Sequence, residues 1–395
     1  MIKVGLYLGS QPHAGGAFQY GHALLDALSR LPRAEFDVRC CFSDEAWDGI
    51  VSRAGVGAIR APYAWQNRAY DRVLRYLPLA ELAGRWLAGR TPIAKVLESE
   101  PDRIWIFPAQ DTMSYQVRVP ALVTIFDLMH RYEPEFPEVA GFGRGWRRDL
   151  HYRRIVATGA DILVDAAVGA THVAESYGVA RSRLHVLEPV SPPHITARAA
   201  EQGGRDNRLE LPAKYFFYPA QFWAHKNHRR LVLALKQDLS AAPDMTLVLA
   251  GSPKNAYEAL RQQVQESGLG ERVRFAGFVP DEDLPEYYRR ARALIMPTFF
   301  GPTNIPPIEA QMLGCPVACS KIYAMPEQFG DSALYFDPRS VDEMASTMLR
   351  LWTDDALCAE LAARGLERSR DRTPARQAVQ LADILRRVAA SRRFG

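Results

Sequence analysis

The stretch "ALIMPTFFGPTNIPPIEAQMLGCPVACS" (residues 293–320) joins two short apolar runs through a loop and one helical pattern. The runs "ALIMP" and "PVACS" have the length and composition of buried strands, and "PPIEAQML" between them reads as a helix. Pro306 and Pro307 suit a first helical turn, where a missing N–H is tolerated, and Gly314 suits the position just after the helix. This order predicts two parallel strands joined by a crossover helix.

The same alternation runs through the whole chain. Apolar runs such as "KVGLYLG", "FDVRCCF", "RIWIFPA" and "ALVTIFD" precede residues 188–212, and "YFFYPA", "MTLVLAGSP", "VRFAGFV" and "ALYFD" follow them. Residues 188–212 are rich in Pro, Gly and charge, which is typical of a linker. We therefore expect an α/β fold of two Rossmann-like, doubly wound domains facing a central cleft. The expected domains are 1–195 and 205–372, with a C-terminal helix in 373–395 that can pack on either half, the N-terminal domain being the first choice.

Composition restricts the class of protein. A chain of 395 residues suits two or three domains at about 150 residues each. A net charge of +4 is too small to indicate nucleic-acid binding. The five cysteines are scattered and lack a matching histidine set, which favours reduced thiols over disulfides or zinc. Because "IKVGLYLG" reads as a strand and no apolar run approaches about 20 residues, we expect a cytoplasmic protein without a signal sequence or membrane span.

Loops that follow strands are the places to look for a site, since ligands of parallel sheets bind at the carboxyl ends of the strands. Gly15 and Gly16 precede a helix and suit an anion, although a plain turn explains them equally well. They do not form the G-x-G-x-x-G dinucleotide pattern. Asp127 and His130 follow a strand, either as functional groups or as a turn cap and an ordinary loop residue.

The second half carries a similar set of loops. Lys226 and Asn227 lie at a strand-to-helix turn, where they suit a phosphate, or where Asn227 simply caps the helix. Gly251 belongs to the small-residue turn "AGSP". The "DED" of residues 281–283 resembles a metal-binding motif, but it opens a helix, which favours capping over metal binding.

Glu309 is the acidic residue of the opening stretch, and we place it in the first turn of the helix. A carboxylate there also complements the helix dipole by about 0.3–1 kcal/mol, so a structural role is one interpretation. The other combines it with the "GPTN" loop, whose amides suit phosphate while the carboxylate suits ribose hydroxyls. This combination matches a nucleotide-sugar.

The residues 297–338, "PTFFGPTNIPPIEAQMLGCPVACSKIYAMPEQFGDSALYFDP", resemble the donor-site signature of the retaining GT-B glycosyltransferases of family four. "GGAFQYGHALLDAL" and "VTIFDLMHRYEPEFP" are similar to that family's glycine loop and acceptor-side loop, and "FGPTNIPP" and "FWAHKNH" resemble bacterial O-antigen and polysaccharide mannosyltransferases. The resemblance implies that Glu309 binds the donor ribose and Lys226 the diphosphate. It also implies donor contacts from the loops and turns that carry Gly15, Gly16, Gln221, Asn227, Gly251, Val279, Thr303, Asn304 and Ile305.

Three positions depart from the family pattern. Gly301 stands where the family has a first glutamate, Gln221 where it has an arginine, and Phe126 where it has the histidine of the acceptor-side loop. The resemblance then leaves Asp127 and His130 as the polar acceptor-side groups. Asp127, Lys226 and Glu309 are the expected catalytic residues, with Asp127 as the base if the departing phosphate does not take the acceptor proton.

The family resemblance implies a retaining, metal-independent hexosyltransferase without a cofactor. Its donor would be a nucleotide-diphosphate sugar, with GDP-mannose as the first choice, and its acceptor a saccharide or lipid-linked saccharide in surface polysaccharide assembly. Basic and aromatic residues in 65–90 and 141–155 favour either a peripheral contact with the inner face of the membrane or a solvated helix face. Phe126 keeps a catalytically weak homologue as an alternative, and a dehydrogenase is disfavoured by the missing dinucleotide pattern.

Overall fold

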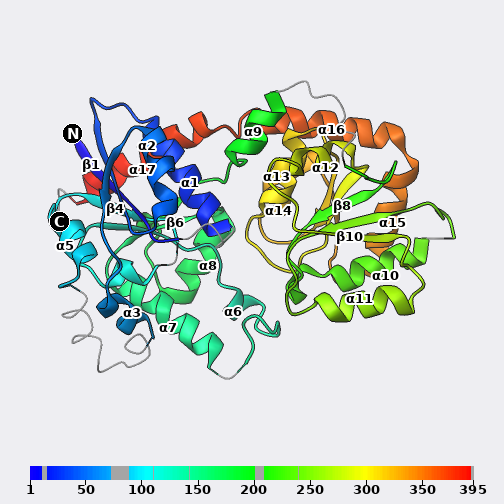
Figure 1. Cartoon of the computed structure of the whole chain (residues 1–395), viewed down its shortest axis with the longest axis horizontal. Coiled ribbons are helices and arrows are strands. Elements are labelled where there is room, and N and C mark those ends of the chain that lie inside the picture. Colours follow the sequence, from blue (N-terminus) through cyan, green and yellow to red (C-terminus); the bar gives the residue numbers. More distant parts are fainter. Residues whose placement is uncertain are drawn as a thin grey trace. The chain divides into compact units, whose positions relative to one another are not determined.

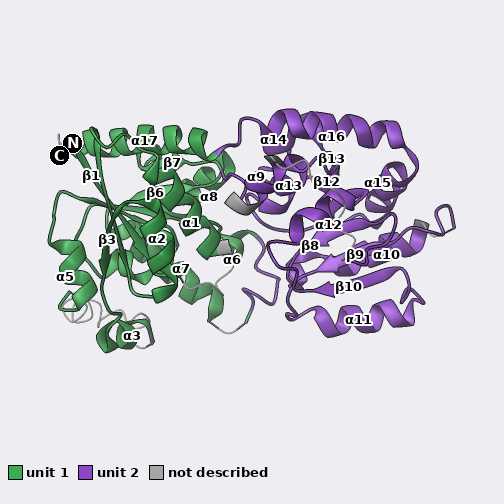
Figure 2. Ribbon diagram, turned by 45° about the horizontal axis from the view of Figure 1, so that its top comes forward, with its two compact units in different colours: residues 1–132, 141–188, 374–395 green, residues 133–140, 189–373 purple. Residues whose placement is uncertain are grey.

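The structure, a computed structural model, describes residues 1–10, 16–72, 89–109, 111–141, 143–200, 209–238 and 240–392. It contains two units, which Figure 2 distinguishes by colour. Unit 1 comprises residues 1–132, 141–188 and 374–395, and unit 2 comprises residues 133–140 and 189–373. This division differs from the expected domains 1–195 and 205–372 in two places. The main part of unit 2 starts at Pro189, and the separate segment 133–140 also belongs to unit 2.

Unit 1 contains a parallel seven-stranded sheet with the order β3-β2-β1-β4-β5-β6-β7. Its strands are β1 (Ile2–Leu8), β2 (Phe36–Phe42), β3 (Gly57–Arg60), β4 (Ile104–Phe107), β5 (Ala121–Thr124), β6 (Asp161–Val164) and β7 (Leu184–Val186). Figure 1 labels the strands β1, β4 and β6 of this sheet. Val4 of β1 lies opposite Val38 of β2 and Ile104 of β4, so β1 is an interior strand of the sheet. The edge strand β3 was not predicted, since its four residues are mostly exposed and carry no apolar run.

Helices cover both faces of this sheet. They are α1 (Gly16–Ser29), α2 (Asp48–Ala54), α3 (Trp65–Arg72), α5 (Pro92–Glu98), α6 (Met129–Tyr132), α7 (Arg144–Ala157), α8 (Ala167–Tyr177) and α17 (Pro374–Ser391). Leu6 of β1 packs in one apolar cluster with Leu24 of α1 and Leu385 of α17, whereas Tyr7 joins a second cluster with Tyr152 of α7. Alternate residues of one strand therefore enter two cores, and the C-terminal helix completes the first of them.

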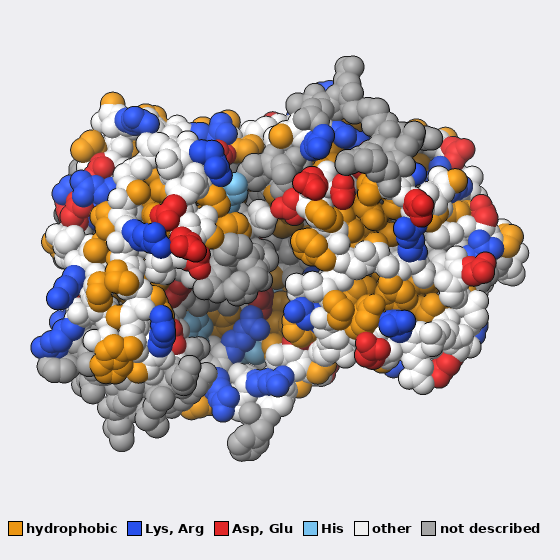
Figure 3. Space-filling view, viewed as in Figure 1, with side chains coloured by type: hydrophobic (Ala, Val, Ile, Leu, Met, Phe, Trp, Pro, Cys, Tyr) orange, Lys and Arg blue, Asp and Glu red, His pale blue; other side chains and the backbone are white. Residues whose placement is uncertain are grey.

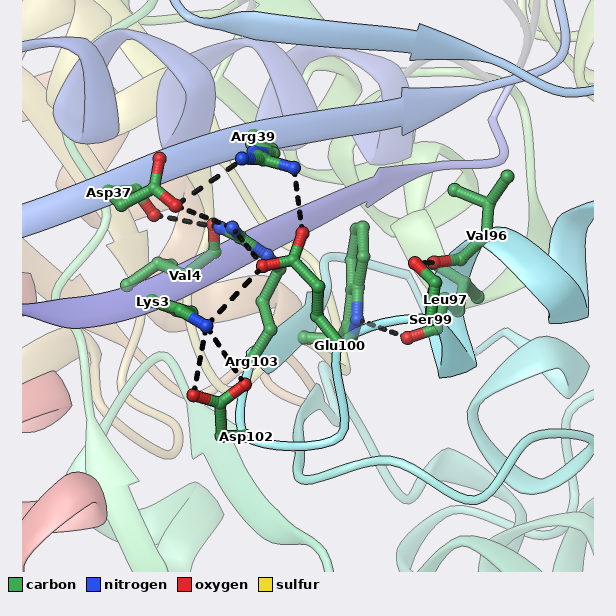
Figure 4. Close-up of polar contacts among 11 residues, drawn as sticks. Lys3, Val4, Asp37, Arg39, Val96, Leu97, Ser99, Glu100, Asp102 and Arg103 are labelled. Carbon is green, nitrogen blue, oxygen red and sulfur yellow. Dashed lines mark hydrogen bonds and ion pairs between the residues drawn. The ribbon is translucent and has the colours of Figure 1, made fainter.

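The amino-terminal edge of this sheet is held by a charged network (Figure 4). The fully buried guanidinium of Arg103 donates hydrogen bonds to the backbone oxygens of Val4 and Asp37, at 2.8 and 2.9 Å. It also binds the carboxylates of Asp37 and Glu100, at 2.6 and 2.9 Å. Because ligands bind at the other edge of a parallel sheet, this network has a structural role.

Unit 2 contains a parallel six-stranded sheet with the order β10-β9-β8-β11-β12-β13. Its strands are β8 (Phe216–Pro219), β9 (Leu247–Ala250), β10 (Val273–Gly277), β11 (Ala293–Met296), β12 (Val317–Ser320) and β13 (Leu334–Phe336). Its helices are α9 (Pro193–Ala200), α10 (His228–Asp238), α11 (Tyr257–Glu266), α12 (Leu284–Arg290), α13 (Ile305–Met312), α14 (Met325–Phe329), α15 (Val341–Thr353) and α16 (Asp355–Ser369). The predicted strand–helix–strand unit of residues 293–320 is confirmed as β11, α13 and β12.

The linker prediction for residues 188–212 is wrong for part of its length. Residues 193–200 form α9, which packs near α12 and α13 of unit 2. Ile195 of this helix is fully buried in the core of unit 2. Among the side chains of this helix that the structure describes, Ile195 alone is both apolar and buried, which gives little periodicity in the sequence. Tertiary packing rather than pattern therefore stabilises this short helix.

All five cysteines are buried free thiols, as predicted. None of the described helices is long and apolar enough to cross a membrane. On the face shown in Figure 3, basic and acidic side chains are interspersed over both units, which agrees with the small net charge.

Candidate functional site

The site is built where the strand order of unit 2 reverses. β8 and β11 are neighbours in the sheet, and the chain continues from β8 to β9 on one side and from β11 to β12 on the other. In doubly wound sheets, this switch point leaves a crevice at the carboxyl ends of the two strands. The loops that follow β8 and β11 are residues 220–227 and 297–304, and they carry most of the predicted residues.

The turn after β8 is held from several directions. Asn227 adopts φ 61°, a left-handed conformation that asparagine tolerates better than most residues. Its side-chain amide donates hydrogen bonds to the backbone oxygens of Pro297 (2.9 Å) and Pro338 (2.8 Å). The hydroxyl of Tyr218 donates to the backbone oxygen of Lys226 at 3.0 Å. The side chain of Asn227 therefore attaches the turn that contains Lys226 to the loop after β11, and it does not cap α10.

Lys226 and Asn304 connect the two loops directly. The ammonium of Lys226 donates a hydrogen bond to the side-chain oxygen of Asn304 at 3.3 Å. Asn304 is buried, and its amide nitrogen lies 3.4 Å from the backbone oxygen of Gly301. A cation is thus held at the switch point beside the start of α13, where backbone amides favour an anion.

The geometry at Gly301 explains its departure from the family pattern. Its φ of 132° is rarely adopted by residues with a side chain, and a Cβ there would lie 2.7 Å from the side-chain nitrogen of Asn304. A glutamate at 301 is therefore incompatible with the observed position of Asn304. The polar group at this point of the site comes from Asn304 instead.

The helix α13 begins one residue earlier than the predicted helix "PPIEAQML", which moves its glutamate further from the helix start. Asn304 precedes it, Ile305 is its first residue, and prolines occupy its first turn as predicted. Thr303 lies in the loop just before it. Glu309 is the fifth residue of the helix, so its predicted place in the first turn is wrong. Because the dipole effect fades beyond the first turn, the dipole explanation for Glu309 loses its basis.

Glu309 is a buried carboxyl group with one specific partner. The hydroxyl of Tyr288, on α12, donates a hydrogen bond of 2.6 Å to Oε2 of Glu309. Oε1 makes no hydrogen bond with the described residues. Burial raises the pKa of Glu309 to about 7, the Tyr288 hydrogen bond lowers it, and the nearby Asp281 raises it further. Oε1 of Glu309 thus remains available to a hydroxyl group of a ligand.

Tyr288 is the residue that the sequence analysis missed. It is fully buried in the "EYYRR" segment, whose tyrosines pack on Phe217 in the core. The sequence held no signal for its contact with Glu309, because twenty residues and a strand separate the two in the chain.

Comparison with known proteins identifies the family of this half of the chain. The family described as "Glycosyl transferases group 1" matches residues 204–368. These residues form a glycosyl transferases group 1 domain. The match covers the switch point, both of its loops and Glu309, and it confirms the family resemblance for this part of the chain.

Individual relatives agree with this assignment. O-antigen chain mannosyltransferase B of Escherichia coli is 32% identical over 157 residues, which are 40% of this chain and 41% of that protein. Mannosylfructose-phosphate synthase of Agrobacterium fabrum is 23% identical over 282 residues, 66% of this chain and 62% of that protein. The chain spans less than two thirds of either relative.

Solved structures extend the likeness to the whole chain. HepE of Anabaena in complex with UDP has a TM-score of 0.69 at 17% identity, with 98% of this chain and 99% of that chain covered. Sucrose-phosphate synthase of Thermosynechococcus elongatus has a TM-score of 0.69 at 18% identity, with 99% and 100% covered. At such identities the likeness shows the fold, which is the GT-B fold of two parallel-sheet α/β domains.

Further predicted residues of the group 1 domain lie at the carboxyl ends of its strands. Gly251 follows β9, and a Cβ there would lie 2.4 Å from the backbone oxygen of Ala220, so the close approach of these segments requires glycine. Val279 follows β10 and is partly buried against the core. Gln221 is exposed, and its side-chain oxygen accepts a hydrogen bond from the indole of Trp223 at 2.9 Å.

The "DED" segment also belongs to this domain. Asp283 directly precedes α12 but makes no side-chain capping hydrogen bond, so the capping prediction is wrong in that respect. Within the described part of the chain, no group of three or more His, Cys, Asp and Glu side chains is arranged to hold a metal ion.

Unit 1 carries the predicted acceptor-side residues. Oδ1 of Asp127 accepts hydrogen bonds from the backbone nitrogen of Met129 at 3.0 Å and from the guanidinium of Arg148 at 2.7 Å. The interpretation of Asp127 as a turn cap is therefore the one that its contacts favour. Phe126 packs edge-on against Tyr20, with ring centroids 5.0 Å apart.

His130 is buried beside Asp127. Nε2 of its ring lies 3.3 Å from the hydroxyl of Tyr177 and 3.6 Å from the carboxylate of Asp149. Burial lowers the pKa of His130 to about 4, with Arg148 as a further cause and Asp149 opposing it. At neutral pH, the ring is uncharged. Gly16 begins α1, and Gly15 lies outside the described residues.

Proposed function

We propose that the protein is a retaining glycosyltransferase that moves a sugar from a nucleotide-diphosphate donor, with GDP-mannose as the first choice, to a saccharide or lipid-linked saccharide. The observation that carries this proposal is the contact between Lys226 and Asn304 at the switch point of a group 1 domain, with the buried carboxyl group of Glu309 on the helix that follows Asn304. The mannosyltransferase relative supports mannose as the sugar. The UDP complex of HepE keeps a uridine donor as the main competitor.

In this mechanism, negative charge grows on the β-phosphate as the bond to the sugar breaks. Lys226 and the amides around Thr303, Asn304 and Ile305 would stabilise that charge, more strongly in the transition state than in the ground state. Glu309 would accept a hydrogen bond from a ribose hydroxyl through Oε1, while Tyr288 holds Oε2. Backbone groups near Gly251 and Val279 would complete the donor site of unit 2, beside Gln221 and Asn227. A donor contact from Gly15 and Gly16 of unit 1 stays part of the proposal on the family resemblance alone.

The contacts of Asp127 and the protonation state of His130 indicate which group takes the proton of the acceptor hydroxyl. Since Asp127 is paired with Arg148 and His130 is neutral and buried, the departing phosphate oxygen is the better acceptor of the hydroxyl proton. Asp127 would then organise this side of the site rather than act as the base. No metal ion or cofactor enters this scheme.

The proposal is tested by incubating the protein with GDP-mannose, UDP-glucose and NAD in the presence of mannose-containing acceptors. We expect transfer from one nucleotide-sugar with the anomeric configuration retained, as read by NMR of the product. In Glu309→Ala, donor affinity should fall strongly. Stabilisation of the protein by NAD alone, or unchanged donor affinity in Glu309→Ala, would contradict the proposal.

The alternative is a catalytically weak homologue that binds nucleotide-sugar or partners an active transferase. The pairing of Asp127 with Arg148 and the apolar Phe126 beside it favour this alternative, because neither offers a free base. If the protein binds the donor but neither transfers the sugar to any acceptor tested nor hydrolyses the donor, it is the catalytically weak homologue.

We also propose a membrane-surface contact for unit 1, as suits a lipid-linked acceptor. Trp65 of α3 and Trp146 of α7 are 67% and 56% exposed, and Arg68 and Arg147 beside them are exposed. Aromatic and basic side chains together favour an anionic lipid surface. Residues 73–88 of the expected surface lie outside the described residues. Co-sedimentation with anionic but not neutral vesicles, weakened in Trp146→Ala, is the expected result, and equal recovery with both vesicle types would contradict it.

A further inference from the structure

A segment from the N-terminal half of the sequence belongs to the donor-side unit. After α6 the chain passes into unit 2 at Glu133 and returns to unit 1 at Gly141, before α7. The segment, "EPEFPEVA" (residues 133–140), contains neither helix nor strand, so side-chain contacts determine its place. It contains three glutamates, of which Glu133 and Glu138 are mostly buried.

Glu138 binds the turn that carries Lys226. Its Oε1 accepts a hydrogen bond from the backbone nitrogen of His225 at 3.3 Å and lies 3.2 Å from Nδ1 of the His225 ring. Although burial raises the pKa of Glu138, its hydrogen bonds with His225 lower it to about 2. The carboxylate is therefore charged throughout the physiological pH range.

His225 is in turn bonded to the loop after β11. Its backbone oxygen accepts hydrogen bonds from the backbone nitrogen of Phe299 at 2.8 Å and from the hydroxyl of Thr298 at 3.3 Å. Phe136 of the segment packs on Phe299, with ring centroids 5.2 Å apart. Both loops of the switch point thus meet at His225, the neighbour of Lys226.

Glu133 anchors the other end of the segment. Its carboxylate accepts hydrogen bonds from the hydroxyl of Tyr323 at 3.0 Å and from the guanidinium of Arg339 at 3.3 Å. Tyr323 has φ 45°, an unfavourable conformation for a bulky residue that persists only where surrounding contacts hold it. Its ring packs edge-on against Phe300, which precedes Gly301.

We propose that Glu138 is a positioning residue of the donor site, which holds Lys226 in place for the donor diphosphate through His225. The inference rests on the proposed function, since it needs Lys226 to bind the diphosphate. It follows that the donor site of unit 2 depends on residues encoded between α6 and α7, whose chain neighbours His130 and Arg148 lie on the acceptor side.

The test uses the full-length protein and its affinities for GDP and UDP, measured by titration calorimetry. Glu138→Gln keeps the shape of the side chain and removes its charge, and Glu258→Gln, at an exposed glutamate of α11 in the same unit, is the matched control. We expect Glu138→Gln to weaken binding of the preferred nucleotide about tenfold, as expected for a lost charge-assisted hydrogen bond. The control should bind as the parent does.

A double-mutant cycle separates positioning from general destabilisation. If Glu138 acts through Lys226, Glu138→Gln should have little further effect on affinity in the Lys226→Ala background. A full additional tenfold loss there, or parent-like affinity of Glu138→Gln alone, would overturn the inference. If Glu138→Gln does not fold, Phe136→Leu loosens the same segment while the carboxylate remains, and the same cycle is run with it.

The cycle also separates this inference from the proposed function. Parent-like nucleotide affinity in Lys226→Ala, or no binding of either nucleotide by the parent protein, would refute the proposed function and with it the role of Glu138. Weak binding by Lys226→Ala together with parent-like binding by Glu138→Gln would refute only the positioning role.

Discussion

At the scale of single residues, Glu309 is the group whose environment is most informative. Its carboxyl group is buried, its pKa is about 7, and Tyr288 occupies one of its two oxygens. A buried acid that titrates near neutrality is typical of a functional site rather than of a structural helix position.

The first prediction concerns the pH dependence of stability. Because the pKa of Glu309 rises from 4.5 to about 7 on folding, the folded state holds a proton that the unfolded state releases. Protonation of Glu309 therefore adds about 3 kcal/mol to the free energy of unfolding below pH 4.5, and this stabilisation is lost as the pH rises to about 7. Urea unfolding at pH 5 and pH 8 should show the loss in the parent protein and not in Glu309→Gln. Parallel pH profiles for the two proteins would contradict the assignment.

The second prediction concerns Gly301. Alanine at this position must adopt φ 132° and displace Asn304, so Gly301→Ala should destabilise the protein by about 1–3 kcal/mol. Since Asn304 binds Lys226, GDP or UDP affinity should fall as well, which calorimetry measures. Gly270→Ala is the control, because no atom lies within 4 Å of the Cβ it would add. Equal behaviour of the two variants would show that Asn304 does not depend on Gly301.

At the scale of helices and strands, the sequence predicted the repeated strand–helix units well, because most strands are short apolar runs and most connections contain a helix. It also predicted the two prolines in the first turn of α13 and Gly314 after its end, where φ is 70°. It missed β3 and α9, which have few apolar residues of their own. It predicted the loops at the switch point, but it missed Tyr288 and the Glu138–His225 contact, which depend on distant segments meeting in space.

The third prediction concerns the charged network at the amino-terminal edge of unit 1. Arg103→Met removes a fully buried guanidinium and leaves Asp37 and Glu100 without it, which should cost about 3 kcal/mol of unfolding free energy. Lys3→Met is the control in the same network, because its side chain is 37% exposed and such pairs contribute at most about 1 kcal/mol. Chemical denaturation measures both. A cost below that of Lys3→Met would show that Arg103 is not the centre of the network.

At the scale of the whole molecule, the chain crosses between the two units four times, after residues 132, 140, 188 and 373. Each unit therefore includes segments from distant parts of the sequence. The periodic pattern of residues 374–391 predicts a helix, but only the folded chain specifies the core that this helix enters.

The fourth prediction tests that arrangement. Leu385 of α17 is fully buried in the core of unit 1, so Leu385→Ala should destabilise unit 1 by about 2–5 kcal/mol. Hydrogen exchange should then quicken in β1 and β2 and change little in β8 and β11. Val379→Ala, at an exposed position of the same helix, should change neither the stability of unit 1 nor the hydrogen exchange of its strands. Equal acceleration in unit 2 would contradict the assignment of α17 to unit 1.

The central claim is that the switch point of unit 2 binds a nucleoside diphosphate through Lys226. Its most direct test is titration calorimetry of GDP, UDP and NAD into the parent protein, Lys226→Ala and Lys236→Ala, the last a control at an exposed lysine of α10. The account predicts that GDP or UDP binds the parent and Lys236→Ala equally, and Lys226→Ala at least about tenfold more weakly. Binding of NAD alone, or equal affinity of all three proteins, would contradict it.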